Sequence, residues 1–536
     1  MIVLGLHGGV TINQHEPAAA LLVDGAISAV CEEERYLRNK GCYGLLPIYA
    51  IRAVLKQANL KMQDVDLIVT PGETYQDFDG VIRDLIRHEY GHVPPIKQVH
   101  HQLAHLATAF YGSGHESALC LSLDASGDGS AGFIGEASIT GGINVLENIP
   151  NKNSLGMFYT TMTHFLGFTD GDEYKVMGLA PYGNPDIDLA AFLKPADGGW
   201  ELDRSYIRST PPVRSPFEPL YSSKLAQLLG QTNRLPSSTF EQFHKDLAAS
   251  TQATFEEALM RLVTARAADK PHLRNLCYAG GIALNCVANH RLIASGIFDD
   301  IYVPPVASDR GLALGCAYLG AIDLGDRPQP ISHASLGTEY SNDDIRQELE
   351  SNGCRFAEID DPSEFAANLI ADGKIIGWHQ GRSEAGARAL GNRSILARPG
   401  GIEVRDEVNR KIKFRESFRP FAPAVLAERA DEFFTMNGKE SPFMCATYSA
   451  RTGQHDQLGA VVHVDGTARV QTVSNKNGPF HSLIQHLDRA TGIPVVLNTS
   501  FNLKGQPIVE TPRDALMTFF GCGLNDLIVG NYHISK

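Results

Sequence analysis

The order of the predicted elements at the start of the chain constrains the fold most. Apolar runs with period-2 patterning predict strands, and apolar residues recurring every three to four positions predict helices. The expected strands are 2–6, 18–23, 27–32, 66–70 and 118–124, with further strands within 133–146, and the expected helices are 47–58 and 100–111. Strands that alternate with helices in this way predict an α/β fold.

The length of the chain requires more than one core. A chain of 536 residues is expected to form two to four domains, at roughly 100–200 residues each. Proline, glycine and polar residues cluster at 326–341 and predict a linker. We therefore expect one domain at 1–330 and another at 340–536. Within the first, the more polar span 185–252 is expected to be an insertion of helices and loops, and no internal repeat is clear.

Charge and cysteine usage narrow the class of protein. A net charge of −14 disfavours a protein that binds nucleic acid over a wide surface. The nine cysteines are dispersed, and no two form a CxxC pair, which is typical of reduced thiols. No apolar run approaches the ~20 residues of a membrane helix, and the first residues lack the features of a signal peptide. We expect a cytoplasmic protein with no membrane and no nucleic-acid partner.

Two histidines and two aspartates form a candidate metal site. His101 and His105 are four residues apart in an uninterrupted apolar helix pattern, so both imidazoles face one side. Asp124 ends the next strand, where sites form in open α/β sheets, and Asp309 begins a later helix. The alternatives are a pair of hydrogen-bonded interior histidines and an N-terminal helix cap at Asp309.

Two glycine turns are candidates for phosphate binding. Residues 279–285 (AGGIALN) and 122–130 (SLDASGDGS) each follow a predicted strand. Bare amides at the start of a helix can receive a phosphate group. The alternative is that the glycines serve only the geometry of a tight turn.

The second half of the chain contains a group of cations beside glycine, proline and aromatic residues. Its members are Arg382, Arg388, Arg393, Lys413, Arg415, Arg419 and Arg469. The alternating segment KIKFRESFRPF predicts a strand that places Lys413 and Arg415 on one face. Guanidinium groups match phosphate oxygens in pairs, and Asn498, Ser500 and Asn502 add neutral donors. We expect a site for a phosphorylated substrate and a nucleoside triphosphate; an RNA groove is the disfavoured alternative.

Several segments resemble a known family. HEPAAALLVDG, HHQLAHLATAFYGSG, DEYKVMGLAPYG, YAGGIALN, GARALGNRSIL, KFRESFRPFAPAV and LNTSFNLKGQPIVETPRDAL are similar to the signature blocks of the NodU/CmcH-type O-carbamoyltransferases. Enzymes of that family carbamoylate nodulation factors, cephalosporins and aminoglycosides. The blocks follow the family's order and cover nearly the whole chain.

The resemblance implies an N-terminal actin-like (ASKHA) domain and a C-terminal YrdC-like α/β domain. The C-terminal domain would make carbamoyl-adenylate from carbamoyl phosphate and ATP. The N-terminal domain would pass the carbamoyl group to a hydroxyl of a small molecule, as in antibiotic biosynthesis. The implied cofactors are Mg²⁺ with ATP and a divalent metal, Fe(II) being the ion most often implied. A homodimer is left open.

The resemblance also assigns roles to residues. His101, His105, Asp124 and Asp309 become metal ligands, and His15 would activate or orient the acceptor, the alternative being a turn hydrogen bond. Gly280, Gly281 and Asn285 would hold the nucleotide. Carbamoyl phosphate and ATP would bind at Arg388, Lys413, Arg415, Arg419, Asn498 and Ser500. Lys175 and Glu173 would line the acceptor site or form an ordinary surface ion pair. The chain departs from the family at Glu16, Ser383, Ala385 and Ala387, which affects the fine shape of the pocket.

Two other functions share these parts. A threonylcarbamoyl-type tRNA-modifying enzyme would need a basic RNA-facing surface, which the net charge of −14 disfavours. A non-catalytic nucleotide-sensing module would not need Lys413.

Overall fold

The computed structural model describes residues 1–9, 14–208, 218–416 and 418–536. It divides into two compact units. The N-terminal unit comprises Met1–Ala26, Tyr43–Pro47 and Lys61–Ile331, and the C-terminal unit comprises Ile27–Cys42, Ile48–Leu60 and Ser332–Lys536. The break after Ile331 lies within the segment expected as a linker. Residues 27–42 and 48–60 belong to the C-terminal unit, although the expected boundary placed them in the first domain.

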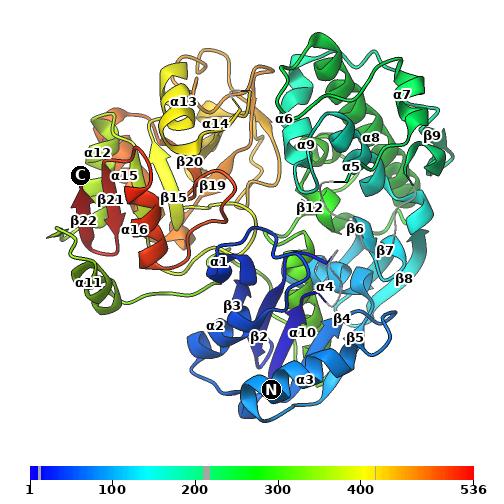
Figure 1. Ribbon diagram of the computed structural model, residues 1–536, viewed down its shortest axis with the longest axis horizontal. Helices are drawn as coiled ribbons and strands as arrows, with labels where there is room; N and C mark the ends of the chain where they lie inside the picture. Colours follow the sequence, from blue (N-terminus) through cyan, green and yellow to red (C-terminus); the bar gives the residue numbers. More distant parts are fainter. Residues whose placement is uncertain (10–13, 209–217, 417) are drawn as a thin grey trace. The chain divides into compact units, whose positions relative to one another are not determined.

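The first sheet of the chain has the strand order β3-β2-β1-β4-β5 (Figure 1). Its strands are β1 (Ile2–His7), β2 (Ala18–Val23), β3 (Ala26–Glu32), β4 (Leu67–Pro71) and β5 (Ile96–Val99). The hairpin β1–β2 is antiparallel and pairs Ile2 with Val23 through to His7 with Ala18. β4 is parallel to β1, and β5 is parallel to β4. The hairpin predicted from the sequence is confirmed.

The second sheet repeats this topology. Its strands are β6 (Ser117–Gly127), β7 (Ser130–Ser138), β8 (Gly142–Pro150), β11 (Asn275–Ala279) and β12 (Asp300–Tyr302). Their order is β12-β11-β6-β7-β8: the first strand again lies between its hairpin partner and the parallel fourth strand. This duplicated sheet is the architecture expected of an actin-like unit, and it is present although the sequence shows no clear repeat.

Helices complete the N-terminal unit. They are α3 (Phe78–Tyr90), α4 (His101–Ser113), α5 (Leu155–Phe165), α6 (Glu173–Leu179), α7 (Ser223–Leu229), α8 (Gln242–Asp269), α9 (Cys286–Ala294) and α10 (Leu312–Asp323). The polar span 185–252 contains α7, the start of α8 and the hairpin β9 (Leu193–Ala196)–β10 (Gly199–Leu202). This matches the expected mixture of helices and loops in the part of the span that is described.

Glycine allows α10 to approach both β1 and α4 closely. A Cβ atom on Gly5 of β1 would lie 1.8 Å from the carbonyl oxygen of Ala313, and one on Gly315 would lie 1.9 Å from that of Ala104. Side chains at these positions would collide with backbone atoms. The start of α10, where Asp309 lies, is therefore held beside the first turns of α4.

The C-terminal unit is built on a mixed sheet of order β13-β22-β21-β14-β15-β20-β16-β19. The strands are β13 (Ala357–Glu358), β14 (Ile376–His379), β15 (Arg393–Ala397), β16 (Ala422–Leu426), β19 (Gln471–Val473), β20 (Val495–Ser500), β21 (Asp526–Val529) and β22 (Tyr532–Ser535). The helices are α1 (Glu33–Leu37), α2 (Ile48–Ala58), α11 (Asn342–Ser351), α12 (Pro362–Ala371), α13 (Ile402–Val408), α14 (Ala430–Phe433), α15 (Pro479–Thr491) and α16 (Pro512–Phe520). Trp378 lies at the centre of the apolar core.

The expected α/β class is confirmed, and two sheets of the chain share one strand order, but two local predictions are wrong. The segment expected as a strand from Lys411 begins in a π-helix, Asn409–Lys413, that ends at Phe414 with φ 47°. The expected hairpin at 461–471 is not formed: β18 (Thr467–Ala468) pairs with β17 (Tyr448–Ser449). Among the described residues, every helix is too short or too polar to cross a lipid bilayer.

Candidate functional site

The four predicted metal ligands meet in the N-terminal unit. The Nε2 atoms of His101 and His105 lie 3.2 and 3.3 Å from Oδ2 of Asp124. The same two nitrogens lie 3.5 and 3.3 Å from Oδ1 of Asp309. Both imidazoles are buried, His105 completely. The sequence thus predicted a set of residues that three separate segments bring together.

Local hydrogen bonds fix the start of α4. His100 caps the helix, with its ring nitrogen accepting from the N–H of Gln102. The N–H of His101 donates to Asp128 Oδ2 at 2.8 Å. Gly127 leaves room for the His101 ring, since a Cβ there would lie 2.3 Å from the ring carbons. The SLDASGDGS segment therefore supports a ligand as well as supplying Asp124.

The charges of the four side chains stabilise one another. Burial opposes protonation of His101, but Asp309 and Asp124 outweigh it and raise its pKa to about 10. Burial alone would raise the pKa of Asp309, but the adjacent imidazoles hold it well below its usual range. This is an ion-pair network that can accept a cation, and a divalent ion bound by the same nitrogens would take the place of the protons.

The donor set fits a divalent metal. Ligand atoms about 2.0–2.2 Å from a metal ion are separated from one another by roughly 3.0–3.5 Å, and the contacts here are 3.2–3.5 Å. All four donor atoms lie within 4.8 Å of one another. Two imidazoles and two carboxylates suit Fe(II), Zn²⁺ or Mn²⁺ better than Ca²⁺. Asp309 faces the histidines, and Ser308 occupies the helix-capping position without a cap hydrogen bond.

His15 is close enough to this cluster to respond to its charge. Burial lowers the pKa of His15, but the carboxylates of Asp309 and Glu16 raise it above its ordinary value. Glu16 itself has a φ of 60° and forms an ion pair of 2.5 Å with Arg310, so the loop that carries His15 is anchored beside Asp309. Its ring stacks at a tilt against Tyr43, with centroids 5.5 Å apart.

His7 is a neighbour of the site that sequence reasoning missed. Its Nε2 lies 3.0 Å from the carbonyl oxygen of His15 and 3.7 Å from Oδ2 of Asp309. Complete burial, offset only in part by Asp309, lowers its pKa to about 4, so it is neutral at pH 7. The sequence feature that could have indicated it is its position at the end of β1, directly before two glycines, where an actin-like fold has its first turn.

The second glycine turn lies beside the same ligands. A Cβ on Gly281 would lie 3.1 Å from Asp124 Oδ1, and Gly280 has a φ of 94°. Asn285 caps α9 by accepting from Ala288 N–H, and its amide exchanges hydrogen bonds with Gln252 of α8. The glycines thus serve the geometry of a tight turn, and the turn also lies beside Asp124.

Glu173 and Lys175 each contact a different neighbour. The carboxylate of Glu173 accepts from Thr160 at 2.9 Å, and burial raises its pKa. Lys175 forms an ion pair of 2.9 Å with Asp172 and lies over the Phe168 ring. Their role in binding an acceptor stays a prediction.

In the C-terminal unit, Lys413 is a buried cation of the predicted group. Its Nζ donates to the carbonyl oxygen and Oγ of Ser500 at 2.7 and 3.2 Å, and to the carbonyl oxygen and Oδ1 of Asn502 at 3.2 and 2.6 Å. Burial, followed by Arg415 and Arg419, lowers its pKa well below the usual value for lysine. The three cations therefore lie close enough to repel one another, as expected where an anion binds.

The arginines of this group divide into two kinds. Arg415 donates to Asn409 Oδ1 at 2.8 Å and lies over the Phe421 ring, and Arg419 contacts Glu416 at 3.5 Å. Arg388 is half-buried on an irregular loop. These three keep side chains on or near the surface of the unit, where a ligand can reach them.

Arg382 and Arg393 belong instead to the scaffold. Arg382 donates to the carbonyl oxygens of Gly337, Ser28 and Leu336. Arg393 is completely buried and donates to four carbonyl oxygens, those of Gln380, Asn392, Glu510 and Thr338. Their expected place among the phosphate-binding cations is therefore wrong, because backbone oxygens take up their donors.

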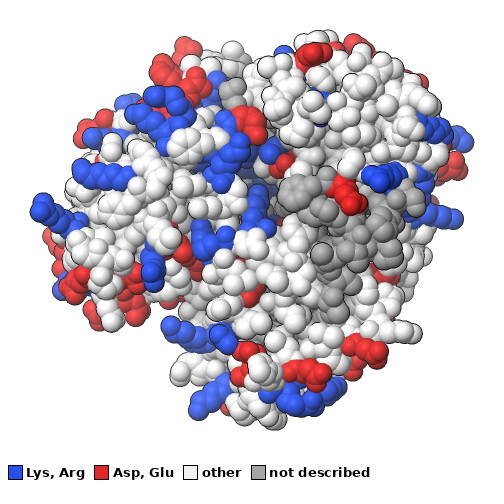
Figure 2. Space-filling model, viewed as in Figure 1, with Lys and Arg blue, Asp and Glu red and all other residues white. Residues whose placement is uncertain are grey.

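Asn498 is buried on β20, next to Ser500. Its Nδ2 donates to the carbonyl oxygen of Ala389 and to Gln471 Oε1 at 3.2 and 3.1 Å, and its buried Oδ1 has no hydrogen-bond partner among the residues that the structure describes. On the face shown in Figure 2, lysine and arginine side chains gather over the region of β19 despite the net charge of −14.

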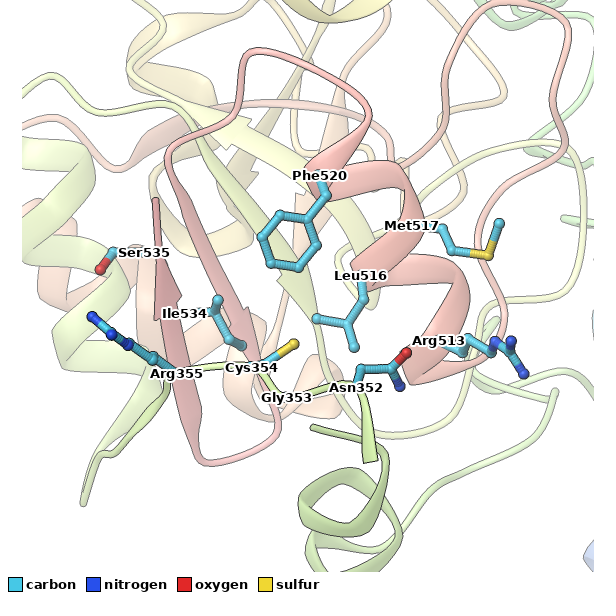
Figure 3. Close-up of a pocket in the computed structure, with 10 residues that line it drawn as sticks. All are labelled: Asn352, Gly353, Cys354, Arg355, Arg513, Leu516, Met517, Phe520, Ile534 and Ser535. Atoms are coloured by element: carbon cyan, nitrogen blue, oxygen red, sulfur yellow. The ribbon is translucent and has the colours of Figure 1, made fainter. Parts of the chain in front are cut away.

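A separate open pocket of about 470 Å³ lies between α16 and β22. Figure 3 shows Leu516, Phe520, Ile534 and Cys354 turned toward this space, while Arg355 and Arg513 extend away from it. None of the predicted site residues lines it, so it is distinct from the cation site of the same unit.

Comparisons with known proteins show which family the chain resembles. The family model described as "Carbamoyltransferase N-terminus" matches residues 72–318, and "Carbamoyltransferase C-terminus" matches 367–536. The nodulation protein NolNO of Sinorhizobium fredii is 37% identical over 100% of this chain and 83% of its own length. NolO of Bradyrhizobium diazoefficiens is 40% identical over 82% of this chain and 78% of its own. The match to the crystal structure of T.kodakarensis HypF covers 60% of this chain and 48% of that one at 14% identity, with a TM-score of 0.33.

Proposed function

Because the chain belongs to the carbamoyltransferase family of the NodU/CmcH type and is an O-carbamoyltransferase, we propose how its two units divide the reaction. Carbamoyl phosphate and ATP bind in the C-terminal unit and form carbamoyl-adenylate. The N-terminal unit then transfers the carbamoyl group to a hydroxyl of a small molecule of natural-product type. The observation that carries this proposal is the presence of two chemically different sites, one of cations and one of metal ligands.

In the C-terminal unit, water cleaves carbamoyl phosphate into carbamate and inorganic phosphate, and a carbamate oxygen then attacks the α-phosphorus of ATP. Pyrophosphate leaves, and carbamoyl-adenylate remains. Lys413, Arg388, Arg415 and Arg419 bind and orient the phosphate groups, and their positive charge stabilises the anionic transition states. Asn498 and Ser500 contribute neutral hydrogen bonds; the Asn498 Oδ1, which has no partner among the described residues, can accept one from the amino group of carbamoyl phosphate. Mg²⁺ is expected to accompany ATP.

In the N-terminal unit, His15 accepts the proton of the acceptor hydroxyl, whose oxygen attacks the carbamoyl carbon, and AMP leaves. Asp309 and Glu16 raise the pKa of this imidazole above its ordinary value, which favours acceptance of a proton. The glycine turn at Gly280 and Gly281 with Asn285 holds the adenylate. A divalent ion, for which we favour Fe(II), held by His101, His105, Asp124 and Asp309 would supply Lewis-acid stabilisation of the departing phosphate charge.

The first half-reaction gives the direct test. Protein incubated with ATP, Mg²⁺ and carbamoyl phosphate should release pyrophosphate, and omission of carbamoyl phosphate should abolish the release. His15→Asn should leave pyrophosphate release intact while transfer to an acceptor is lost. Equal loss of both steps would contradict the division of labour. An electrophoretic shift with tRNA would instead favour the threonylcarbamoyl-type alternative.

A further inference from the structure

The loop that carries Arg388 has no regular secondary structure, yet its neighbours on both sides are fixed. Glu384 and Gly386 precede Arg388 and are buried; Leu390 and Asn392 follow it. One carboxylate oxygen of Glu384 accepts from the N–H groups of Leu390 at 2.6 Å, Asn392 at 3.4 Å and Arg393 at 3.3 Å. Glu384 thereby closes the loop across Arg388.

A segment from the start of the chain holds the other side of the loop. The Nη2 of Arg35 donates to the carbonyl oxygens of Glu384 at 3.1 Å and Gly386 at 2.8 Å. The carboxylate of Glu32 accepts from the N–H of Gly386 at 2.5 Å and lies 3.4 Å from Arg35 Nε. Gly386 has a φ of 107°, which glycine adopts readily, and these hydrogen bonds hold both of its peptide groups in place.

The burial of these charges is unusual for a surface helix. Glu32 and Arg35 are 3% and 2% exposed, and Glu384 is 2% exposed. Removing such charges from water is unfavourable unless each is paired, and here the partners are the backbone groups around Arg388. The sequence separation of 351 residues between Arg35 and Gly386 means that chain continuity does not impose the contact.

We infer that Arg35 and Glu384 are positioning residues that set the place of Arg388 for phosphate binding, an inference that rests on the proposed function. The segment Ile27–Cys42 is then part of the phosphate site of the C-terminal unit rather than of the N-terminal chemistry. Arg35 acts only through the loop and does not touch the substrate.

A double-mutant cycle tests this inference. The measurement is the KM for carbamoyl phosphate in pyrophosphate release at saturating ATP. Arg35→Lys keeps the charge but replaces the planar guanidinium fork by a more compact ammonium group, so the two carbonyl oxygens are no longer held in the same geometry. Its KM should rise about tenfold with kcat little changed, because small displacements of binding groups weaken binding steeply. Arg388→Ala should raise KM about 100-fold, the effect of losing a charge-assisted pair.

The double variant decides between positioning and a separate role. If Arg35 acts through Arg388, Arg35→Lys combined with Arg388→Ala should show the KM of Arg388→Ala alone. Multiplication of the two effects, to about 1000-fold, would overturn the inference. Wild-type protein that releases no pyrophosphate with carbamoyl phosphate would refute the proposed function instead, so the two failures are distinguishable.

Two further comparisons of variants separate the inferred effect on KM from a general loss of folding. Arg382→Lys is the matched control, because Arg382 also donates to three backbone carbonyls but to none within 384–392; its KM should be unchanged. Should Arg35→Lys unfold, Glu384→Ala should raise KM about tenfold by freeing the loop, and Glu384→Gln, which keeps an acceptor oxygen, should restore it. Equal KM values for the two Glu384 variants would also overturn the inference.

Discussion

The histidine–aspartate cluster and the cation group were both predicted as sets, but the structure uses their members differently. In the cluster, all four side chains direct their ligand atoms at one another. In the cation group, Arg382 and Arg393 donate to the backbone, whereas Arg388, Arg415 and Arg419 stay near the surface. Residue type and spacing thus identify the four members of the histidine–aspartate cluster, since their side chains contact one another directly. They identify an arginine-rich site only in part, because guanidinium groups also serve as supports for loops.

The largest expected effect concerns the metal cluster. Asp309→Asn should lower carbamoyl transfer about 1000-fold, since a Lewis acid contributes several kcal/mol to the transition state. Bound metal, measured by plasma mass spectrometry, should fall well below one per chain. Glu16→Gln, which changes a neighbouring carboxylate outside the ligand set, should retain the metal. Full metal content in Asp309→Asn would contradict the assignment.

A smaller loss is expected at the cation site. Lys413→Ala should lower pyrophosphate release about 100-fold, because a charge-stabilising donor is removed from the phosphate site. The metal content of the N-terminal unit should not change. Lys413→Arg should not rescue the activity, since a planar guanidinium cannot replace an ammonium group surrounded by four oxygens. Activity equal to wild type in the alanine variant would remove Lys413 from the site.

The two kinds of arginine should differ in stability. Arg393→Met leaves buried carbonyl oxygens without donors and should destabilise the C-terminal unit by about 3 kcal/mol. Arg388→Met should change stability by less than about 1 kcal/mol. Trp378 is buried in the core of this unit, so its fluorescence in a Trp200→Phe background reports unfolding of that unit alone. Equal destabilisation by the two variants would erase the distinction between scaffold and site.

The smallest expected effect is a pH dependence at Glu33. Burial raises the pKa of this carboxyl to about 7, although the N–H groups of Ala50 and Tyr49 oppose the shift. A carboxyl with a raised pKa stabilises the fold when protonated, so its contribution is present at low pH and is lost as pH rises through about 7. Between pH 5 and 7, wild type should lose about 1–3 kcal/mol relative to Glu33→Gln. The same Trp378 signal measures it, and parallel pH profiles would contradict the raised pKa.

Much of the fold could be predicted because its signals are local. The hairpin of β1 and β2, the helix α4 and the strand β20 follow from apolar periodicity and turn residues within short windows. The cluster could be predicted because His101 and His105 share one helix face, and because Asp124 and Asp309 each lie at the end of an element.

The rest depends on contacts that no local pattern records. The alternation in KIKFRESFRPF predicted a strand. In the structure, the buried Lys413 donates to four oxygen atoms, and Phe414 adopts a left-handed backbone conformation. The partner of Thr467–Ala468 is a distant strand rather than its neighbour. The inferred role of Arg35 depends on its contact with Gly386, which is 351 residues away in the sequence. His7 was missed because a single histidine at a strand end has no spacing partner.

The most direct test is mass-spectrometric detection of carbamoyl-adenylate formed by His105→Ala from carbamoyl phosphate and ATP. The variant should lack the metal and still form the adenylate at a rate near that of wild type, since activation is assigned to the C-terminal unit. Loss of adenylate together with the metal would show that activation depends on the N-terminal cluster and would contradict the account.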